Sequence, residues 1–174
     1  MQYANEDFEE FADDFIRGLQ QNDRIVFTER LQRDALDFSI ESLKHVDEYL
    51  NYVFQNRPRP KGWVNKLQSF FGNRNLDLPE GRDWITTVLW GGAYVGEVIR
   101  RNAPRKYNWV GFDDWIREHP EQVQILGSEK ALQVCTLLTQ ESGAFTLPLN
   151  KVYKFICEGI EESTWFYADC EVRE

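Results

Sequence analysis

The chain has 174 residues and carries 29 acidic against 20 basic side chains, a formal net charge of −9. This length suits one domain with its own core, and a charged fraction of 28% with a mean hydropathy of −0.56 excludes the disordered and membrane classes. The N-terminus is acidic and shows no secretory signal, and Cys135, Cys157 and Cys170 form no Cys-x-x-Cys pair. We therefore expect a single-domain cytoplasmic protein with reduced thiols.

The charge is distributed unevenly along the chain. Residues 1–50 hold 5 basic and 13 acidic side chains, residues 51–110 hold 10 and 4, and residues 111–174 hold 5 and 12. Two acidic flanks thus enclose a basic middle. Such an asymmetry can steer association with a charged partner, although an acidic surface also simply keeps a protein soluble.

The first predicted element is a helix over residues 6–20. Asn5 is its candidate N-cap, and the carboxylates that follow suit the positive end of the helix dipole. An apolar stripe consists of Phe8, Phe11, Ala12, Phe15, Ile16 and Leu19. The opposite face carries Glu6, Glu9, Glu10, Asp13 and Asp14. That face is either an ordinary solvated surface or a docking surface for a basic partner.

Residues 1–56 are expected to form a helical part of the domain. Residues 24–36 fit either a short strand at Ile25-Val26-Phe27 or a helix, and we favour a helix over 28–35. A second helix has Ser39 as its N-cap and ends before Pro58. On the flank of the second helix, Glu41, His45 and Glu48 recur at i, i+4 and i+7. Three such side chains on one helix, with no second motif, favour an exposed polar face over a metal site.

Residues 57–81 form a basic loop that holds three of the six prolines. Aromatic side chains interleaved with lysine and arginine can bind single-stranded nucleic acid, but the acidic flanks would oppose it, so no nucleic-acid partner is expected. We predict instead a connection with a helical turn near residues 63–71. Its anchors to the core would be Trp63, Leu67, Phe70 and Phe71.

Residues 82–102 are the most apolar segment, and they are predicted to form a central buried helix. Gly91, Gly92 and Gly96 would each cost it about 0.8 to 1 kcal/mol relative to alanine. We therefore expect a neighbouring element to approach the backbone closely on the Gly92/Gly96 side. Glu97 lies beside that side; it is either an acid or base acting with Tyr94 and Arg101, or a structural carboxylate paired with Arg100 or Arg101. We favour the structural role.

The second half of the chain is predicted to hold a small antiparallel sheet and a C-terminal helical part. Three strands are expected within residues 107–139, over 107–112, 122–126 and 132–139, the last two joined by a hairpin at 127–130. A loop over 141–148 should precede the C-terminal part, residues 150–172. In it, Asn150 should cap a helix that Gly159 ends, and a last helix should span 161–172, although 165–167 could also pair as a strand. The fold class is thus α+β.

Three short segments resemble a known group of proteins. They are Leu36-Asp37-Phe38-Ser39-x-Glu41-Ser42-Leu43, Gly92-Ala93-Tyr94-x-Gly96-Glu97-Val98-Ile99-Arg100-Arg101 followed by Trp109, and Pro148-x-x-Lys151-Val152-x-Lys154 ahead of Gly159-x-Glu161-Glu162-Ser163. Together they resemble a family of small bacterial cytosolic α+β proteins, some encoded where toxin and immunity genes cluster. The resemblance spans residues 36–167 and implies the order of elements, but it carries no catalytic residue.

The motifs of common enzyme classes do not occur in the sequence. There is no Gly-x-Ser-x-Gly, no His-Glu-x-x-His and no Gly-x-x-x-x-Gly-Lys phosphate loop. The run from Gly91 to Gly96 is similar to a dinucleotide loop, but it lacks a preceding strand and has helical periodicity. We therefore expect no catalytic residue, metal or cofactor.

The leading hypothesis is a non-enzymatic bacterial immunity protein that occludes a cognate toxin domain, with acidic patches facing basic residues of the toxin. Candidate contacts, chosen by charge density, are Asp13, Asp14, Asp113, Asp114, Glu118 and Glu121. The expected partner is a protein, the chain itself being a monomer or weak dimer that binds no membrane. The alternatives are a small enzyme that uses Glu97, and an accessory binding protein of a mobile element.

Overall fold

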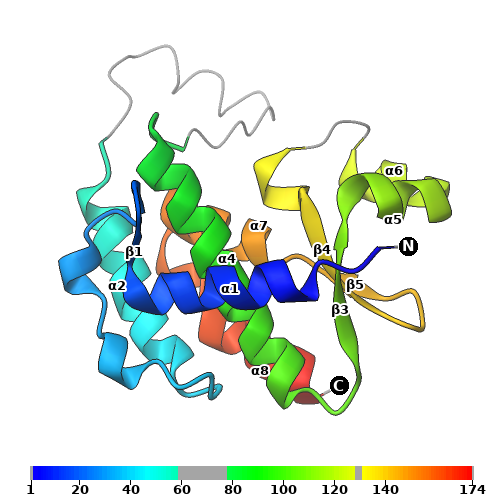
Figure 1. Cartoon of the computed structure of the whole chain (residues 1–174), viewed down its shortest axis with the longest axis horizontal. Coiled ribbons are helices and arrows are strands. Elements are labelled where there is room, and N and C mark those ends of the chain that lie inside the picture. The colour runs from blue at the N-terminus through cyan, green and yellow to red at the C-terminus, as the bar shows by residue number, and fades with distance from the viewer. Residues whose placement is uncertain (1, 59–77, 128–130, 174) are drawn as a thin grey trace.

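A computed structural model of the protein describes residues 2–58, 78–127 and 131–173. These residues form an α+β fold, as predicted, in which α4 runs through the middle of the molecule and the larger sheet lies to one side (Figure 1). The helices are α1 (Asn5–Arg17), α2 (Leu43–Asn56), α4 (Arg82–Asn102), α5 (Phe112–Glu118), α6 (Val123–Leu126), α7 (Pro148–Glu158) and α8 (Thr164–Arg173). The strands are β1 (Leu19–Gln20), β2 (Asp23–Arg24), β3 (Tyr107–Gly111), β4 (Thr136–Gln140) and β5 (Phe145–Thr146).

Helix α4 is the core of the molecule. Every residue from Trp90 to Ile99 is buried, because α1 packs against one side of the helix and α7 and α8 pack against others. A helix that is buried on all sides does not need an exposed polar stripe, which explains the nearly continuous apolar composition of this segment. The helix ends at Asn102, two residues before Pro104, where the residue preceding a proline disfavours helical backbone.

Two of the three glycines in α4 permit close packing. A Cβ atom on Gly92 would lie 2.7 Å from the Cα of Leu149 in α7, and one on Gly96 would lie 2.1 Å from the indole ring of Trp109. The predicted close approach is therefore observed on this side of the helix. Gly91 differs, since a Cβ atom there would meet its nearest neighbour, a ring atom of Phe15, at an ordinary 3.4 Å.

The N-terminal segment joins α1 to the larger sheet. Tyr3 forms an isolated antiparallel bridge with Val110, and the Ala4 amide donates to the Trp109 carbonyl at 3.0 Å. Asn5 was expected to cap α1, but it is the first helical residue, and its Oδ1 instead accepts a hydrogen bond from the Trp109 amide at 2.8 Å. The helix ends at Arg17, short of the predicted boundary, because Gly18 adopts left-handed backbone with φ 71°.

Residues 28–42 differ from the predicted helix. They contain two separate 3₁₀ turns, Thr28–Arg30 and Arg33–Ala35, and α2 begins only at Leu43. The reason lies in a tertiary contact that local sequence does not show. Phe38 has φ 62°, and its amide donates to the hydroxyl of Tyr94 in α4 at 3.1 Å. Ser39 is consequently not the N-cap of α2, although its Oγ accepts from the Ser42 amide within the preceding turn.

The larger sheet has the antiparallel order β3-β4-β5, with Asn108 opposite Thr139 and Val110 opposite Leu137. The predicted strand over 107–112 is confirmed apart from Phe112, which begins α5. The strand over 122–126 is wrong, because a 3₁₀ turn that starts at Pro120 leads directly into α6. Most of the hairpin predicted at 127–130 lies outside the described residues. Residues 132–134 also form a 3₁₀ turn, and the third strand is β5, within the stretch expected to be a loop.

The sheet separates two apolar clusters. Trp109 and Leu138 contribute to the main core around α4, whereas Val110 and Leu137 contribute to a smaller cluster with α5. Alternate residues of each strand thus enter different clusters, as the pleat requires. Asn108 and Thr139 lie on the outer face of the sheet, the same face that Val110 and Leu137 of the smaller cluster occupy.

The C-terminal helices follow the predicted order with shifted ends. Helix α7 has Pro148 in its first turn, so Asn150 is not its cap, and it ends at Gly159 as expected. Helix α8 starts at Thr164 and includes residues 165–167, which excludes the alternative strand. Asp47 of α2 ties α8 to the rest: its Oδ1 accepts from the amide and the hydroxyl of Thr164 at 2.7 and 2.6 Å.

Most of the predicted basic loop, including Trp63, Leu67, Phe70 and Phe71, falls within residues 59–77, outside the described residues. In the described parts of the chain, no helix has both the length and the apolar character that a membrane crossing requires.

Candidate functional site

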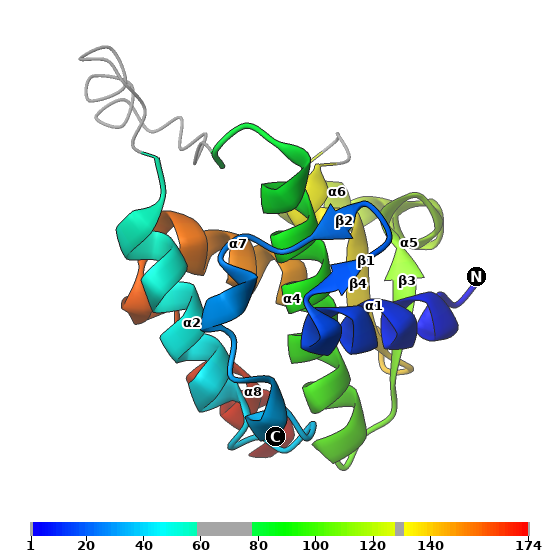
Figure 2. The same cartoon turned by 60° about the vertical axis from the view of Figure 1, so that its left-hand side comes forward.

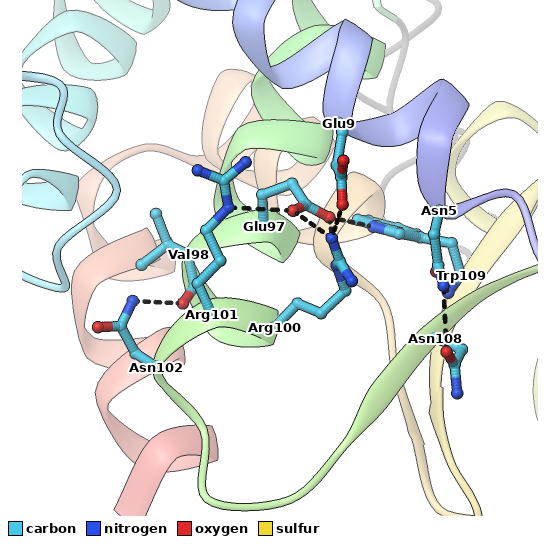
Figure 3. A network of polar contacts seen from close by, with 9 residues as sticks. All are labelled: Asn5, Glu9, Glu97, Val98, Arg100, Arg101, Asn102, Asn108 and Trp109. Atoms are coloured by element: carbon cyan, nitrogen blue, oxygen red, sulfur yellow. Dashed lines mark hydrogen bonds and ion pairs between the residues drawn. The ribbon is translucent and has the colours of Figure 1, made fainter.

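The Glu97 carboxylate is the most buried charge in α4, with a side-chain exposure of 0%. Its Oε1 accepts from Arg100 Nε at 2.8 Å and from the Trp109 indole Nε1 at 2.9 Å, while its Oε2 accepts from Arg100 Nη2 at 3.0 Å and from Arg101 Nε at 3.3 Å. Figure 3 shows these groups converging from α4 and β3, with Glu9 of α1 completing an ion pair to Arg100. Three elements therefore meet at one carboxylate.

The electrostatics of this network indicate a structural role. The hydrogen bond to Glu97 raises the pKa of Arg100 above its usual range, with a further contribution from Glu9. Both oxygens of the carboxylate accept hydrogen bonds from charged or indole donors. Phe8 stacks on Trp109 with ring centroids 4.1 Å apart and covers the indole. The carboxylate is thus enclosed by its partners, with no exposed surface.

The predicted catalytic combination does not assemble. Arg101 does reach Glu97, but the Tyr94 hydroxyl bonds to the Phe38 amide and shares a 2.7 Å hydrogen bond with Ser42 Oγ. Burial raises the pKa of Tyr94, with the Ser42 hydrogen bond opposing that shift. Tyr94 thus fixes the turn before α2. Gly91, Gly92 and Gly96 lie against Phe15, Leu149 and Trp109 within the core.

Asp14 is not a surface residue. Its side chain is 0% exposed, and its Oδ1 accepts from Arg17 Nη1 at 3.2 Å. Burial raises the pKa of Asp14, while Arg17 partly offsets that rise. The prediction that Asp14 contacts a partner is therefore wrong, because the helix turns this carboxylate inward. Its neighbour Asp13 is exposed.

The other candidates lie in or beside α5 on the molecular surface. Asp113, Glu118 and Glu121 are exposed, and Asp114 is half-buried. Asp114 accepts from the Gln2 amide at 3.3 Å and from Arg117 at 2.9 Å, and the bond from Gln2 is the main reason that its pKa is lowered. Glu121 Oε1 lies 3.6 Å from Nδ1 of His119.

The N-terminal segment, which leads into α1, contacts both the larger sheet and α5: Tyr3 bridges Val110, and the Gln2 amide donates to Asp114. Figures 1 and 2 show α1 starting beside β3, with α5 on the same side of the molecule as the N-terminus. Glu6 and Asp7 are exposed in the first turn of α1. We call Glu6, Asp7, Asp113, Asp114 and Glu118 the acidic face. Asp13 lies about 9 Å further along the helix axis than Asp7. Sequence reasoning missed this grouping because its cause, the bridge from Tyr3 to Val110, leaves no local sequence signal.

The polar flank of α2 is occupied by ion pairs. Glu41 pairs with Lys44, which lowers the pKa of Glu41, and His45 Nδ1 lies 3.7 Å from Glu48. Among the described residues, no group of three or more His, Cys, Asp or Glu side chains is arranged to hold a metal ion. Comparison of the chain with protein-family models, with curated proteins and with solved structures found no match in any of the three.

Proposed function

We propose that the protein is a non-enzymatic immunity protein that binds a basic toxin domain through the acidic face and thereby occludes it. One observation carries the proposal: the contacts of Gln2 with Asp114 and of Tyr3 with Val110 tie the segment that leads into the acidic first turn of α1 to the acidic helix α5, which is distant in sequence. Residues 36–167 resemble a family of small bacterial proteins, some of which are encoded where toxin and immunity genes cluster, and this resemblance is consistent with the proposed role.

The scaffold favours rapid and specific association. The carboxylates of the acidic face project from two helices whose inner residues are buried, Phe8 and Phe15 in α1 and Phe112 and Trp115 in α5. Charges fixed on rigid elements do not need to be ordered on binding. A concentrated negative field attracts a basic partner over a distance of about one Debye length, roughly 8 Å at physiological ionic strength, and raises the association rate.

The mechanism that follows is steric. A toxin that acts on an anionic substrate presents basic residues at its own site, and those residues would bind the acidic face in place of the substrate. The interior of the protein takes no chemical part in this mechanism. Glu97 and its partners serve to keep β3, and with it the N-terminal segment and α5, in position against α4.

Charge reversal on the acidic face tests the proposal. The double variant Asp7→Lys and Asp113→Lys should slow association with the proposed toxin partner by about tenfold or more at low salt, and it should flatten the dependence of the rate on salt. Stopped-flow or surface-based kinetics at several ionic strengths would measure both effects. Both substituted positions are exposed but lie in the first turn of a helix, where lysine opposes the helix dipole, so the free energy of unfolding should fall by up to about 1 kcal/mol for each substitution. The rates should therefore be compared at a temperature where the variant remains folded.

Glu158→Lys is the matched control, because it is an exposed reversal at the C-terminal end of α7, where a lysine suits the helix dipole. The association rate of this variant should stay within about twofold of the wild-type rate, because a single distant reversal changes the net charge but not the acidic face. An unchanged rate for the double variant, or an equal loss for the control, would refute binding through the acidic face.

A further inference from the structure

A cavity of about 370 Å³ opens on the outer face of the larger sheet, beside the acidic face. Its floor is the pair Asn108 and Thr139, which lie opposite each other on β3 and β4 and are 4% and 3% exposed. Its walls come from the N-terminal segment, α5, His119 and the turn between β4 and β5. Four separate segments thus enclose the cavity, and its volume is at the lower end of the range for ligand sites.

The lining combines aromatic rings with negative charge. Trp115 and His119 stack with ring centroids 4.0 Å apart, and Tyr3, which is 53% exposed, lies at the rim. Glu118 and Glu141 supply two carboxylates, and the described residues that line the cavity include no lysine or arginine. Glu141 also borders a neighbouring depression lined by Arg105 and Lys106. Glu118 is therefore the carboxylate that distinguishes this cavity.

A buried polar group lies in the wall of the cavity, in Trp115. The residue is 2% exposed, and its indole Nε1 has no hydrogen-bond partner among the described residues. Buried donors in folded proteins nearly always have a partner.

We infer that the cavity receives the side chain of an arginine on the basic protein partner, an inference that rests on the proposed function. A guanidinium group stacks on aromatic rings and binds carboxylates through paired N–H donors. The aromatic wall supplies the first kind of contact and Glu118 supplies the second. The cavity would then fix the position of a partner that the acidic face attracts.

The test uses N-acetyl-arginine amide as a probe, titrated into the isotope-labelled full chain and followed by heteronuclear NMR. The indole N–H signal of Trp115 and the amide signal of Gly143 should shift and saturate. N-acetyl-citrulline amide, a neutral isostere, and N-acetyl-lysine amide should bind at least about fivefold more weakly, since neither combines charge with a planar fork. Equal affinity for the three compounds, or shifts confined to other signals, would overturn the inference.

Glu118→Gln should weaken probe binding by about fivefold, whereas Glu158→Gln, an equal loss of charge at an exposed position of α7 outside the cavity lining, should change it by less than twofold. Similar effects of the two variants would reveal general electrostatic attraction and refute the site. If the probe fails to bind while charge reversal at Asp7 and Asp113 still slows association with the toxin, the cavity assignment fails and the proposed function stands. If the probe binds but charge reversal has no effect, the proposed function fails.

Discussion

Asp14 was predicted from charge density to lie on the surface, but its side chain is buried in the folded protein. Its carboxylate is 0% exposed, one oxygen bonds to Arg17, and the other has no hydrogen-bond partner among the described residues. The neighbouring Asp13 differs by one position, about 100° around the helix, and is exposed. The sequence shows two equivalent aspartates, and only the packing of α1 against α4 separates them.

The raised pKa of Asp14 has a consequence for stability. The folded protein binds a proton at this carboxyl more tightly than the unfolded chain does, so the free energy of unfolding should increase as pH falls from the raised pKa toward 3.8. Asp14→Asn removes this titration. The difference in free energy of unfolding, wild type minus Asp14→Asn, should therefore increase in the same window, as measured by urea denaturation at a series of pH values. Asp13→Asn is the matched control, and a pH-independent difference for Asp14→Asn would contradict the assignment.

The elements of the fold differ in how far sequence predicts them. In the long helices α1, α2, α4 and α7, apolar residues recur at spacings of three and four along the chain, and the order of these helices is as predicted. The segments that failed are short and depend on distant partners. Phe38 takes left-handed backbone because Tyr94 binds its amide, and β5 is only two residues long, Phe145–Thr146, so its pairing with β4 leaves almost no pattern to detect.

The contact between α4 and α7 is a property of the two elements together, and it can be tested by a pair of substitutions. Gly92→Ala would place a Cβ atom 2.7 Å from the backbone of Leu149, so it should lower the free energy of unfolding by about 1 to 3 kcal/mol. Gly91→Ala places its Cβ atom no closer than 3.4 Å to any neighbour and should be neutral or stabilising by up to about 1 kcal/mol. Urea denaturation of the two variants measures the difference. Equal effects would show that the close approach at Gly92 does not constrain the helix.

At the scale of the whole molecule, the candidate site depends on contacts that no single segment encodes. Composition indicates that two acidic regions exist, but the acidic face requires Gln2 and Tyr3 to reach α5 and β3. The cavity beside it requires four segments to converge on the outer face of the sheet. Sequence reasoning found Glu118 by its charge, whereas Trp115 and His119 gave no signal, since a tryptophan at helical spacing is typical of a core.

Glu97 links the helical part of the molecule to the sheet, and its removal should affect the whole fold. Glu97→Gln would leave Arg100 and Arg101 with a neutral neighbour and should lower the free energy of unfolding by about 2 to 4 kcal/mol, because an ion pair with one fully buried member is broken. Glu9→Gln is the control: this partner of Arg100 is 46% exposed, and its loss should cost about 1 kcal/mol or less.

The same pair of variants separates the two roles considered for this carboxylate. If the role of Glu97 is structural, Glu97→Gln should lower the melting temperature. At a temperature where the variant remains folded, it should still bind the proposed toxin partner with unchanged affinity, because its acidic face is intact. Thermal denaturation and equilibrium binding on the same preparation would measure both quantities. If Glu97→Gln had the same stability as the wild type, the hydrogen bonds of Arg100, Arg101 and Trp109 to this carboxylate would not stabilise the fold. The alternative role of Glu97 as an acid or base would then be favoured.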